Sequence, residues 1–416
     1  MNRSVTQQHV EANVGRPSVR FTASLVIGPA CWLMPHQGAI ATLLPQRVGD
    51  IAPADKVPLM MVFSSTAMIV ALLSNIVLGA CSDRTRSRFG KRRPWIVSCS
   101  VLSCLVLLAF ARSSTIAGML VTWCLYELVV NGVAAAMIAQ MSDRVPERWR
   151  GTASSAYGIG QMAGSQLGVL MSAQFLGDVR LGLDFLAMIA LVGGLCAAWL
   201  AGEPGNADEP RESLGLRGVL RVLMFPMSNA SDFYKVLAGR FAMVIASNMA
   251  SGYMLYVMQD YLGLDRAGAA ALLSLNSALM LVIGLVCCVA AGPVADRLGH
   301  TRSLAVATMV VVAVGIIVPF LIPTPVGLVA FACIVGVGQG ANSALVQTIS
   351  LQALPDPSAA AKDLGFLNLA NTLGGVCGSL LGAAVIGRFG YAYVFVFGAL
   401  CALASAVCFR TVRCGA

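Results

Sequence analysis

The chain is dominated by apolar stretches of about twenty residues, separated by short segments that hold most of the charged side chains. An α-helix of about 20 residues crosses the hydrocarbon core of a bilayer, which is roughly 30 Å thick. The pattern therefore predicts an all-α membrane protein with twelve transmembrane helices. We place them at residues 24–45, 58–81, 95–112, 116–141, 152–175, 183–202, 236–260, 269–291, 303–322, 326–350, 363–386 and 391–410.

The positive charges divide unequally between the two sides of these spans. If the N-terminus is cytoplasmic, all Lys and Arg residues fall in inner segments except Arg240, which lies inside a span, and six in the outer loops. An excess of Lys and Arg on the cytoplasmic side sets the orientation of a membrane protein. We therefore expect a multi-pass protein of the cell (inner) membrane with both termini in the cytoplasm. The six outer residues are Arg47, Lys56, Arg112, Arg180, Arg266 and Arg388.

Composition narrows the class of function. Hydrophobic residues make up 57% of the chain and charged residues 11%, against about 25% charged in soluble domains. The net charge of +9 does not indicate nucleic-acid binding, because the basic residues lie between apolar segments and form no basic face. The 13 cysteines form no CxxC pair, and the three histidines belong to no catalytic or metal-ligand motif. We therefore predict no enzyme activity, no cofactor and no metal.

The longest polar interruption divides the spans into two sets of six. Residues 203–235 read as a cytoplasmic linker between two halves at 24–202 and 236–410, with cytoplasmic tails at 1–23 and 411–416. The two halves are predicted to be pseudo-symmetric.

A short motif repeats between the halves. Residues after the second span recur after the eighth at an offset of 213 residues, the distance from Gly79 to Gly292. Two halves of six helices, related as parallel repeats, are the architecture of one class of secondary transporter. The matching pairs are Gly79 and Gly292, Asp83 and Asp296, Arg84 and Arg297, and, after the fourth and tenth spans, Asp143 and Asp356.

The loop from Gly79 to Pro94 carries the strongest family signal. Its residues, and those from Gly292 to Arg302, resemble the cytoplasmic motif G-x-x-x-D-R-x-G-R-R of the major facilitator superfamily. The first copy has three extra residues, and this longer form is similar to that of the plant-type sucrose and the glycoside-pentoside proton symporters. The resemblance implies a solute transporter that works by alternating access.

The resemblance also implies a latch that holds the cytoplasmic side closed. In the family the motif aspartate, here Asp83, meets the start of the eleventh span, near Asp363, and the motif arginines pair with the acid that matches Asp143. A carboxylate at a helix N-terminus is favoured by the helix dipole. The predicted latch residues are Gly79, Asp83, Arg84, Arg88, Arg92, Arg93, Asp143, Gly292, Asp296, Arg297 and Arg302.

Glu127 is the candidate for proton coupling. It lies inside the fourth span, where a charged side chain costs about 2.5–3.5 kcal/mol, so it should face a cavity or a partner. The spacing of Glu127, Asn131 and Asp143 resembles the fourth helix of the sucrose symporters, in which the acid couples proton to sugar. The alternative is a carboxylate solvated at the outer mouth. The family's sugar-binding arginine on this helix is Ile138 here, which leaves sucrose itself in question.

Polar side chains within other spans are candidates for solute binding. Amides both donate and accept hydrogen bonds, which suits hydroxylated solutes, but they also join helices to one another. Arg240, near the cytoplasmic start of the seventh span, is expected to extend toward the interface. The candidate substrate-binding residues are His36, Gln37, Asn131, Gln161, Asn248, Gln339, Asn342, Asn368 and Asn371.

Two transport functions are consistent with these features. One is proton-coupled uptake of a sugar or glycoside, favoured by the long loop motif and Glu127. The other is proton-driven efflux of amphipathic compounds, for which the 19 methionines would provide an adaptable cavity. The fifth span has no proline, unlike many efflux antiporters of this superfamily, which favours uptake. The predicted partners are a small-molecule solute, protons and the lipid bilayer; the sequence makes no prediction of oligomeric state.

Overall fold

The computed structural model describes residues 18–146, 149–206, 231–298, 300–353 and 360–412. Each of the twelve predicted spans coincides with helix, and the described residues contain no strand, so the predicted fold class is confirmed. The first half contains α2 (Val19–Gly38), η1 (Ala39–Leu43), α3 (Leu44–Ile51), α4 (Lys56–Arg84), α5 (Arg93–Arg112), α6 (Ile116–Arg144), α7 (Arg150–Ala173) and α8 (Val179–Ala201). The second half contains α10 (Ser231–Ser251), α11 (Met254–Tyr256), η3 (Val257–Tyr261), α12 (Arg266–Leu298), α13 (Thr301–Leu321), α14 (Pro325–Gln352), α15 (Ala360–Phe389) and α16 (Tyr393–Arg410).

Ten helical segments among the described residues are long and apolar enough to cross a membrane. The remaining two spans are α2 with η1 and α3, which contains Pro29 and Pro35, and α7, which is rich in glycine and serine. Because all twelve pack in one bundle, the protein is a multi-pass integral membrane protein. We call the end of the bundle where α2 begins and α16 ends the terminal end, and the opposite end the distal end.

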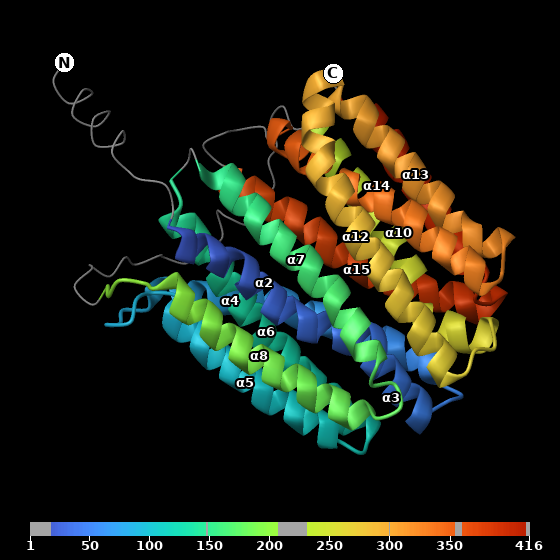
Figure 1. The fold of residues 1–416 in the computed structure, drawn as a ribbon, viewed down its shortest axis with the longest axis horizontal. Coiled ribbons are helices and arrows are strands. Elements are labelled where there is room, and N and C mark those ends of the chain that lie inside the picture. The colour runs from blue at the N-terminus through green and yellow to red at the C-terminus, as the bar shows by residue number, and fades with distance from the viewer. Residues whose placement is uncertain (1–17, 147–148, 207–230, 299, 354–359, 413–416) are drawn as a thin grey trace.

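The two halves pack their helices in the same pattern. In the first half α2 contacts α7 and α8, α5 contacts α6 and α8, and α4 contacts α6. In the second half the equivalent helices repeat each of these pairs: α10 contacts α15 and α16, α13 contacts α14 and α16, and α12 contacts α14. Figure 1 shows the first half at the lower left and the second half at the upper right. The sequence repeat therefore corresponds to a structural repeat of six helices.

The halves meet through two equivalent helix pairs, α7 with α12 and α4 with α15. In the first pair Met162 of α7 packs against Gly284 of α12. In the second pair Met68 of α4 packs against Gly375 of α15. Each pair therefore places a methionine of the first half in a gap left by a glycine of the second half.

Helix α7 lies unusually close to α2 because of three glycines spaced four residues apart. A side chain at Gly160, Gly164 or Gly168 would overlap the backbone of α2 at its Val26, Ala30 and Met34 carbonyl groups, respectively. Small residues at this spacing let two membrane helices approach until their backbones touch. This packing fixes the position of the α2 segment that precedes His36.

The first helix of each half loses its regular α-geometry toward the distal end. After Pro35, α2 continues as the π-helix η1, and α10 is followed by a turn, α11 and the π-helix η3. A π-turn inserts one residue into the helical ladder and is frequent at functional sites. The two irregular segments face each other across the two halves, as the contacts of α11 with η1 and α3 show.

Candidate functional site

The polar centre of the first half is a contact between His36 on α2 and Glu127 on α6. The distance from His36 Nε2 to Glu127 Oε1 is 2.9 Å. Glu127 is 3% exposed, so it lies inside the protein and not at a solvated mouth of the bundle. A buried carboxylate within a span needs a partner of this kind, because an unpaired charge there is costly. Sequence reasoning had assigned His36 to the solute and had not connected it to Glu127.

Aromatic rings enclose this pair. The His36 ring stacks loosely on Trp123 and Tyr126, with centroid distances of 6.2 and 6.3 Å. Both aromatic side chains are fully buried. His36 Nδ1, Trp123 Nε1 and Tyr126 Oη are buried without a hydrogen-bond partner in the described part of the chain. Hydrogen-bonding atoms without a described partner therefore surround the pair.

Two asparagines lead from Glu127 toward the space between the halves. Asn131 donates from Nδ2 to Glu127 Oε2 over 3.1 Å and to the Glu127 carbonyl over 2.8 Å. Asn75 of α4 donates to Asn131 Oδ1 over 3.1 Å. Asn75 is exposed on the same face of α4 as Met68, which contacts Gly375 of α15, so Asn75 borders the space between the halves. The chain Asn75–Asn131–Glu127–His36 thus joins that space to the buried pair.

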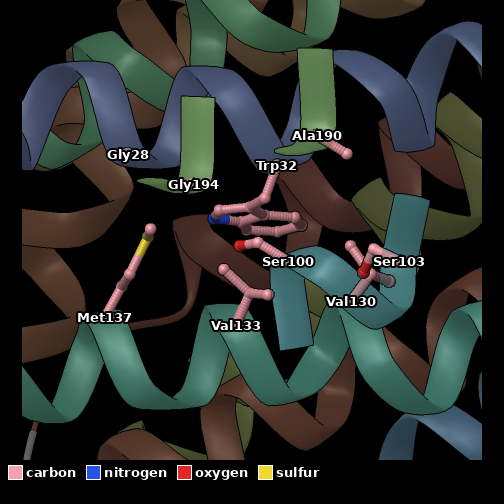
Figure 2. A pocket seen from close by; sticks show the side chains of 9 residues that line it. All are labelled: Gly28, Trp32, Ser100, Ser103, Val130, Val133, Met137, Ala190 and Gly194. Carbon is pink, nitrogen blue, oxygen red and sulfur yellow. The ribbon is translucent and has the colours of Figure 1, made fainter. Parts of the chain in front are cut away.

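Trp32 of α2 lies inside the first half, among residues of α5, α6 and α8. Figure 2 shows its indole ring between Gly194 and Ala190 of α8, Ser100 of α5 and Val133 of α6. The cavity beside it has a volume of about 10 Å³, which is enough for no more than one water molecule. Trp32 is therefore a packing residue in this conformation.

The second half contains a larger cavity of about 200 Å³. Two of the predicted amides, Asn342 and Asn371, line it, and so does Arg240, which donates to Ser350 Oγ over 3.1 Å. Arg240 therefore points into the protein and does not extend to the interface as the sequence suggested. The other lining residues are Met243, Val244, Met309, Ser343, Val346 and Phe409.

The remaining amide candidates are spread over both halves. Gln339 donates to Ser247 Oγ over 3.0 Å, which joins α14 to α10. Asn248 donates to the Val244 carbonyl of its own helix. Gln37 and Gln161 are half-buried on α2 and α7. The Asn368 side chain lies outside the described residues.

Two of the predicted latch residues, Arg92 and Asp143, form an ion pair. Arg92, which is 2% exposed, donates from Nε to Asp143 Oδ2 over 2.9 Å and from a guanidinium nitrogen to Ser82 Oγ over 2.9 Å. Arg88 is exposed and lies over the Phe89 ring, and Arg84 is also exposed. Of the motif arginines expected to pair with Asp143, the structure gives this contact to Arg92. Among the described residues, no atom lies within 4 Å of the position that a side chain at Gly79 would occupy.

Glu203, assigned from sequence to the linker, caps the N-terminus of α5. Its carboxylate accepts hydrogen bonds from the backbone N–H groups of Lys91, Arg92 and Arg93 at 2.7–3.1 Å. Gly90 precedes them with φ +96°, and any side chain there would overlap Glu203. The start of the predicted linker therefore belongs to the latch of the first half.

Asn206 binds the same loop from the other side. Its side chain accepts from the Ser87 N–H and donates to the Thr85 carbonyl, each over 3.0 Å. The segment 203–206 thus fastens both ends of the loop between α4 and α5.

The second copy of the motif is less fully described. Arg302 donates to the Val412 carbonyl over 2.7 Å, which ties the start of α13 to the end of α16. Arg297 is exposed, and Arg93 is half-buried at the start of α5. The side-chain positions of Asp83, Gly292, Asp296 and Asp363, and the whole of Asp356, lie outside the described residues.

Polar contacts between the halves gather at the distal end. Lys56 Nζ lies 2.6 Å from Asp260 Oδ2, and Arg266 pairs with Asp50. Tyr256 donates from its hydroxyl to the Pro45 carbonyl over 2.9 Å. Gln259 donates to Gln46 and Gln174 to Ser274. These hydrogen bonds and ion pairs join the two halves at the distal end and close that side of the protein.

Three features are typical of secondary transporters: two repeated halves of six helices, closure of the bundle at one end, and a buried ionisable pair near the space between the halves. The sequence profile of the Major Facilitator Superfamily matches residues 37–287 and 236–413. The chain therefore belongs to the major facilitator superfamily, and it is a transporter and not an enzyme.

Solved structures share this fold at low sequence identity. The human organic anion transporter MFSD10 (TETRAN) is 15% identical with a TM-score of 0.69, covering 95% of this chain and 100% of that one. The nucleoside transporter NupG is 14% identical with a TM-score of 0.68, covering 94% and 100%. The POT-family transporter PepTSo is 14% identical with a TM-score of 0.71, covering 95% and 98%. Comparison with curated proteins gives no significant match.

Proposed function

We propose that this protein is a proton-coupled transporter that takes up a small hydroxylated solute, a sugar or glycoside, by alternating access. The observation that carries the proposal is the buried contact between His36 and Glu127. Two ionisable side chains in the middle of the membrane are costly, so their presence there favours a role in moving charge. The polar atoms around them favour a hydroxylated solute, since His36 Nδ1 and Tyr126 Oη have no partner among the described residues.

The coupling follows from the charge of the pair. With Glu127 ionised and His36 protonated, the two attract each other and hold α2 to α6. A proton on Glu127 together with a neutral His36 keeps the net charge at zero but replaces the ion pair with a neutral hydrogen bond. Loss of a proton from either state leaves a net negative charge in the span, which disfavours movement through an occluded state. Transport through the occluded state therefore requires the proton.

The position of the basic residues and the contacts at the distal end indicate which end of the bundle faces the cytoplasm. The terminal end carries the basic loop between α4 and α5, so we place it, with both termini, in the cytoplasm of a cell whose inner membrane holds the protein. The distal end is then the outer side, and the contacts between the halves at that end close the protein toward the outside. The Arg92–Asp143 pair and the Glu203 cap would control the exchange between the two states.

The test is transport in proteoliposomes with an imposed pH gradient. We expect uphill uptake of a sugar or glycoside by the wild type, while Glu127→Gln loses uphill uptake but still exchanges labelled for unlabelled solute. Asp184→Asn is the matched control, because Asp184 is a carboxylate that pairs with Arg112 at the distal surface. Equal loss of uphill uptake and exchange in Glu127→Gln would contradict the coupling role.

A second candidate is proton-driven efflux of amphipathic compounds. It is favoured by Met68 and Met162 at the contacts between the halves and by Met243 and Met309 in the cavity of the second half. Methionine side chains adapt to ligands of different shape. Proton movement in the same proteoliposomes with lipophilic cations, and none with sugars, would select this function.

A further inference from the structure

Arg240 is a half-buried cation that the proposed coupling mechanism does not use. It lies on α10, nine residues after the helix begins at Ser231, and is therefore about 14 Å into the bundle from the terminal end. A basic side chain at such depth is unfavourable unless a carboxylate or another strong acceptor meets it.

Its surroundings provide only a weak acceptor. Within the described part of the chain Arg240 contacts the Ser350 hydroxyl, and no ion pair includes it. Ser350 in turn donates to the Val346 carbonyl over 2.6 Å, so its oxygen is free to accept from Arg240. The guanidinium group has several further N–H donors in a planar fork, and these remain available.

The cavity beside Arg240 is polar where it approaches the centre of the transporter. Asn342 and Asn371 supply amide groups from α14 and α15, and Ser343 supplies a hydroxyl. Gln339 and Ser343 lie four residues apart on one face of α14 and are both exposed within the span, so this face of α14 is not covered by other helices. Met309 and Phe409 close the opposite side with buried apolar surface.

The size of the cavity limits what it can hold. Its volume of about 200 Å³ is below the roughly 300–1,000 Å³ typical of sites that enclose a whole drug-sized ligand. It fits one end of a solute, while the rest extends into the space between the halves. A planar cation flanked by amides is the arrangement that recognises carboxylate, phosphate or sulfonate oxygens.

We propose that the cavity of Arg240, Asn342 and Asn371 binds an anionic group of the transported solute, so that the solute is an acidic sugar or glycoside and not a neutral one. This inference rests on the proposed function for the rest of the solute, but the anion site is defined by the cavity alone. The solute anion supplies the strong acceptor that Arg240 lacks. The amides orient the anion and discriminate against a neutral analogue, which would leave the guanidinium group unsatisfied.

The test compares ligands that differ only in charge. Binding to the purified full chain is measured at one pH without a gradient, using glucuronate against glucose, and a hexose phosphate and inorganic phosphate as further anions. We expect at least one anion to bind about tenfold or more tightly than glucose, and Arg240→Gln to remove that preference. Arg240→Lys should keep part of it, because lysine retains the charge but loses the planar fork.

Two control variants show whether the preference for anions depends on Arg240 itself. Arg180→Gln removes a positive charge from the exposed start of α8 and should leave the preference unchanged. Asp184→Asn, which breaks an ion pair with Arg112 at the distal surface, should also retain it. The binding assay uses no pH gradient, so a failure of the coupling proposal would not affect this outcome. If Arg240→Gln does not yield a monodisperse protein, Arg240→Lys carries the comparison with an expected loss of several-fold.

The proposal is overturned if none of the three anions binds more tightly than glucose. It is also overturned if Arg240→Gln and Arg240→Lys weaken glucose and glucuronate by the same factor, since Arg240 would then support the structure of the helix and not the ligand.

Discussion

The Glu203 cap makes the sharpest prediction about the latch. In Glu203→Ala the N–H groups of Lys91, Arg92 and Arg93 lose the carboxylate that accepts from them at 2.7–3.1 Å. Loss of an N-cap acceptor costs about 0.5–2 kcal/mol, and loss of a negative charge from a helix N-terminus adds about 0.3–1 kcal/mol. The first turn of α5 should therefore be destabilised locally by about 1–3 kcal/mol. That is roughly a five- to 150-fold increase in its open population.

Hydrogen exchange measures this opening directly. We expect the amides of residues 91–93 to lose about tenfold or more of their protection in Glu203→Ala, and Glu203→Gln, which keeps one acceptor oxygen, to lie between it and the wild type. Asp178→Ala is the matched control, because Asp178 caps α8 at the distal end through the Leu181 N–H. Unchanged protection of residues 91–93 in Glu203→Ala would refute the assignment of Glu203 as their cap.

Three further predictions concern the contacts that close and hold the bundle. Asp260→Asn removes the ion pair with Lys56, which is worth about 0.2–1 kcal/mol. The population of molecules open at the distal end should therefore rise by up to about fivefold, as measured by distances between spin labels placed across that end. An unchanged distance distribution would show that this ion pair does not hold the distal end closed. Gly164→Ala should lower the yield of folded protein, because its new methyl group would overlap the α2 backbone at Ala30, whereas Gly158→Ala meets open space and should be tolerated; equal yields would contradict backbone contact between α2 and α7. Burial and the hydrogen bond that Tyr391 donates to Asp260 raise the pKa of the Tyr391 phenol, so its contribution to stability should be complete below about pH 10 and decline at more alkaline pH. Thermal unfolding should show a smaller alkaline decline in Tyr391→Phe than in the wild type, and an equal decline would contradict this role of Tyr391.

The number and order of the spans could be predicted from sequence because the bilayer imposes one length and one polarity on every helix. The irregular ends of the first and seventh spans could not, because hydropathy is the same for an α-turn and a π-turn. Pro35 was the one residue in the sequence that indicated an irregular helix in the first span, and the π-helix begins four residues after it, at Ala39.

The candidate site was predicted in part. Glu127 was identified because a carboxylate in a span is costly wherever it lies. Its contact with His36 joins residues 91 positions apart, and no periodicity reports on a pair at that separation. Asn75 could not be predicted for a related reason. The sequence does not distinguish an amide that joins two helices from one that faces water, whereas the structure shows that Asn75 is exposed and donates to Asn131.

The register of the latch and the role of the linker were beyond sequence reasoning. The loop contains several arginines within one short segment, and only the fold selects Arg92 as the partner of Asp143. Glu203 follows the last apolar stretch of its half and precedes Pro204, which is the pattern of a linker. Its capping role depends on α8 ending beside the start of α5, a tertiary relation that local pattern does not encode.

The methionine and glycine contacts between the halves bear on how the two halves find each other. Met162 and Gly375 occupy equivalent positions of the repeat, since 375 − 162 = 213, the offset of the motif itself. A symmetric duplication would place the same residue at both, but here the first half supplies both protrusions and the second half both recesses. Two copies of the first half would set methionine against methionine, and two copies of the second would leave gaps. At this pair of equivalent positions, the exchange of methionine for glycine thus favours packing of the first half against the second over packing of two like halves.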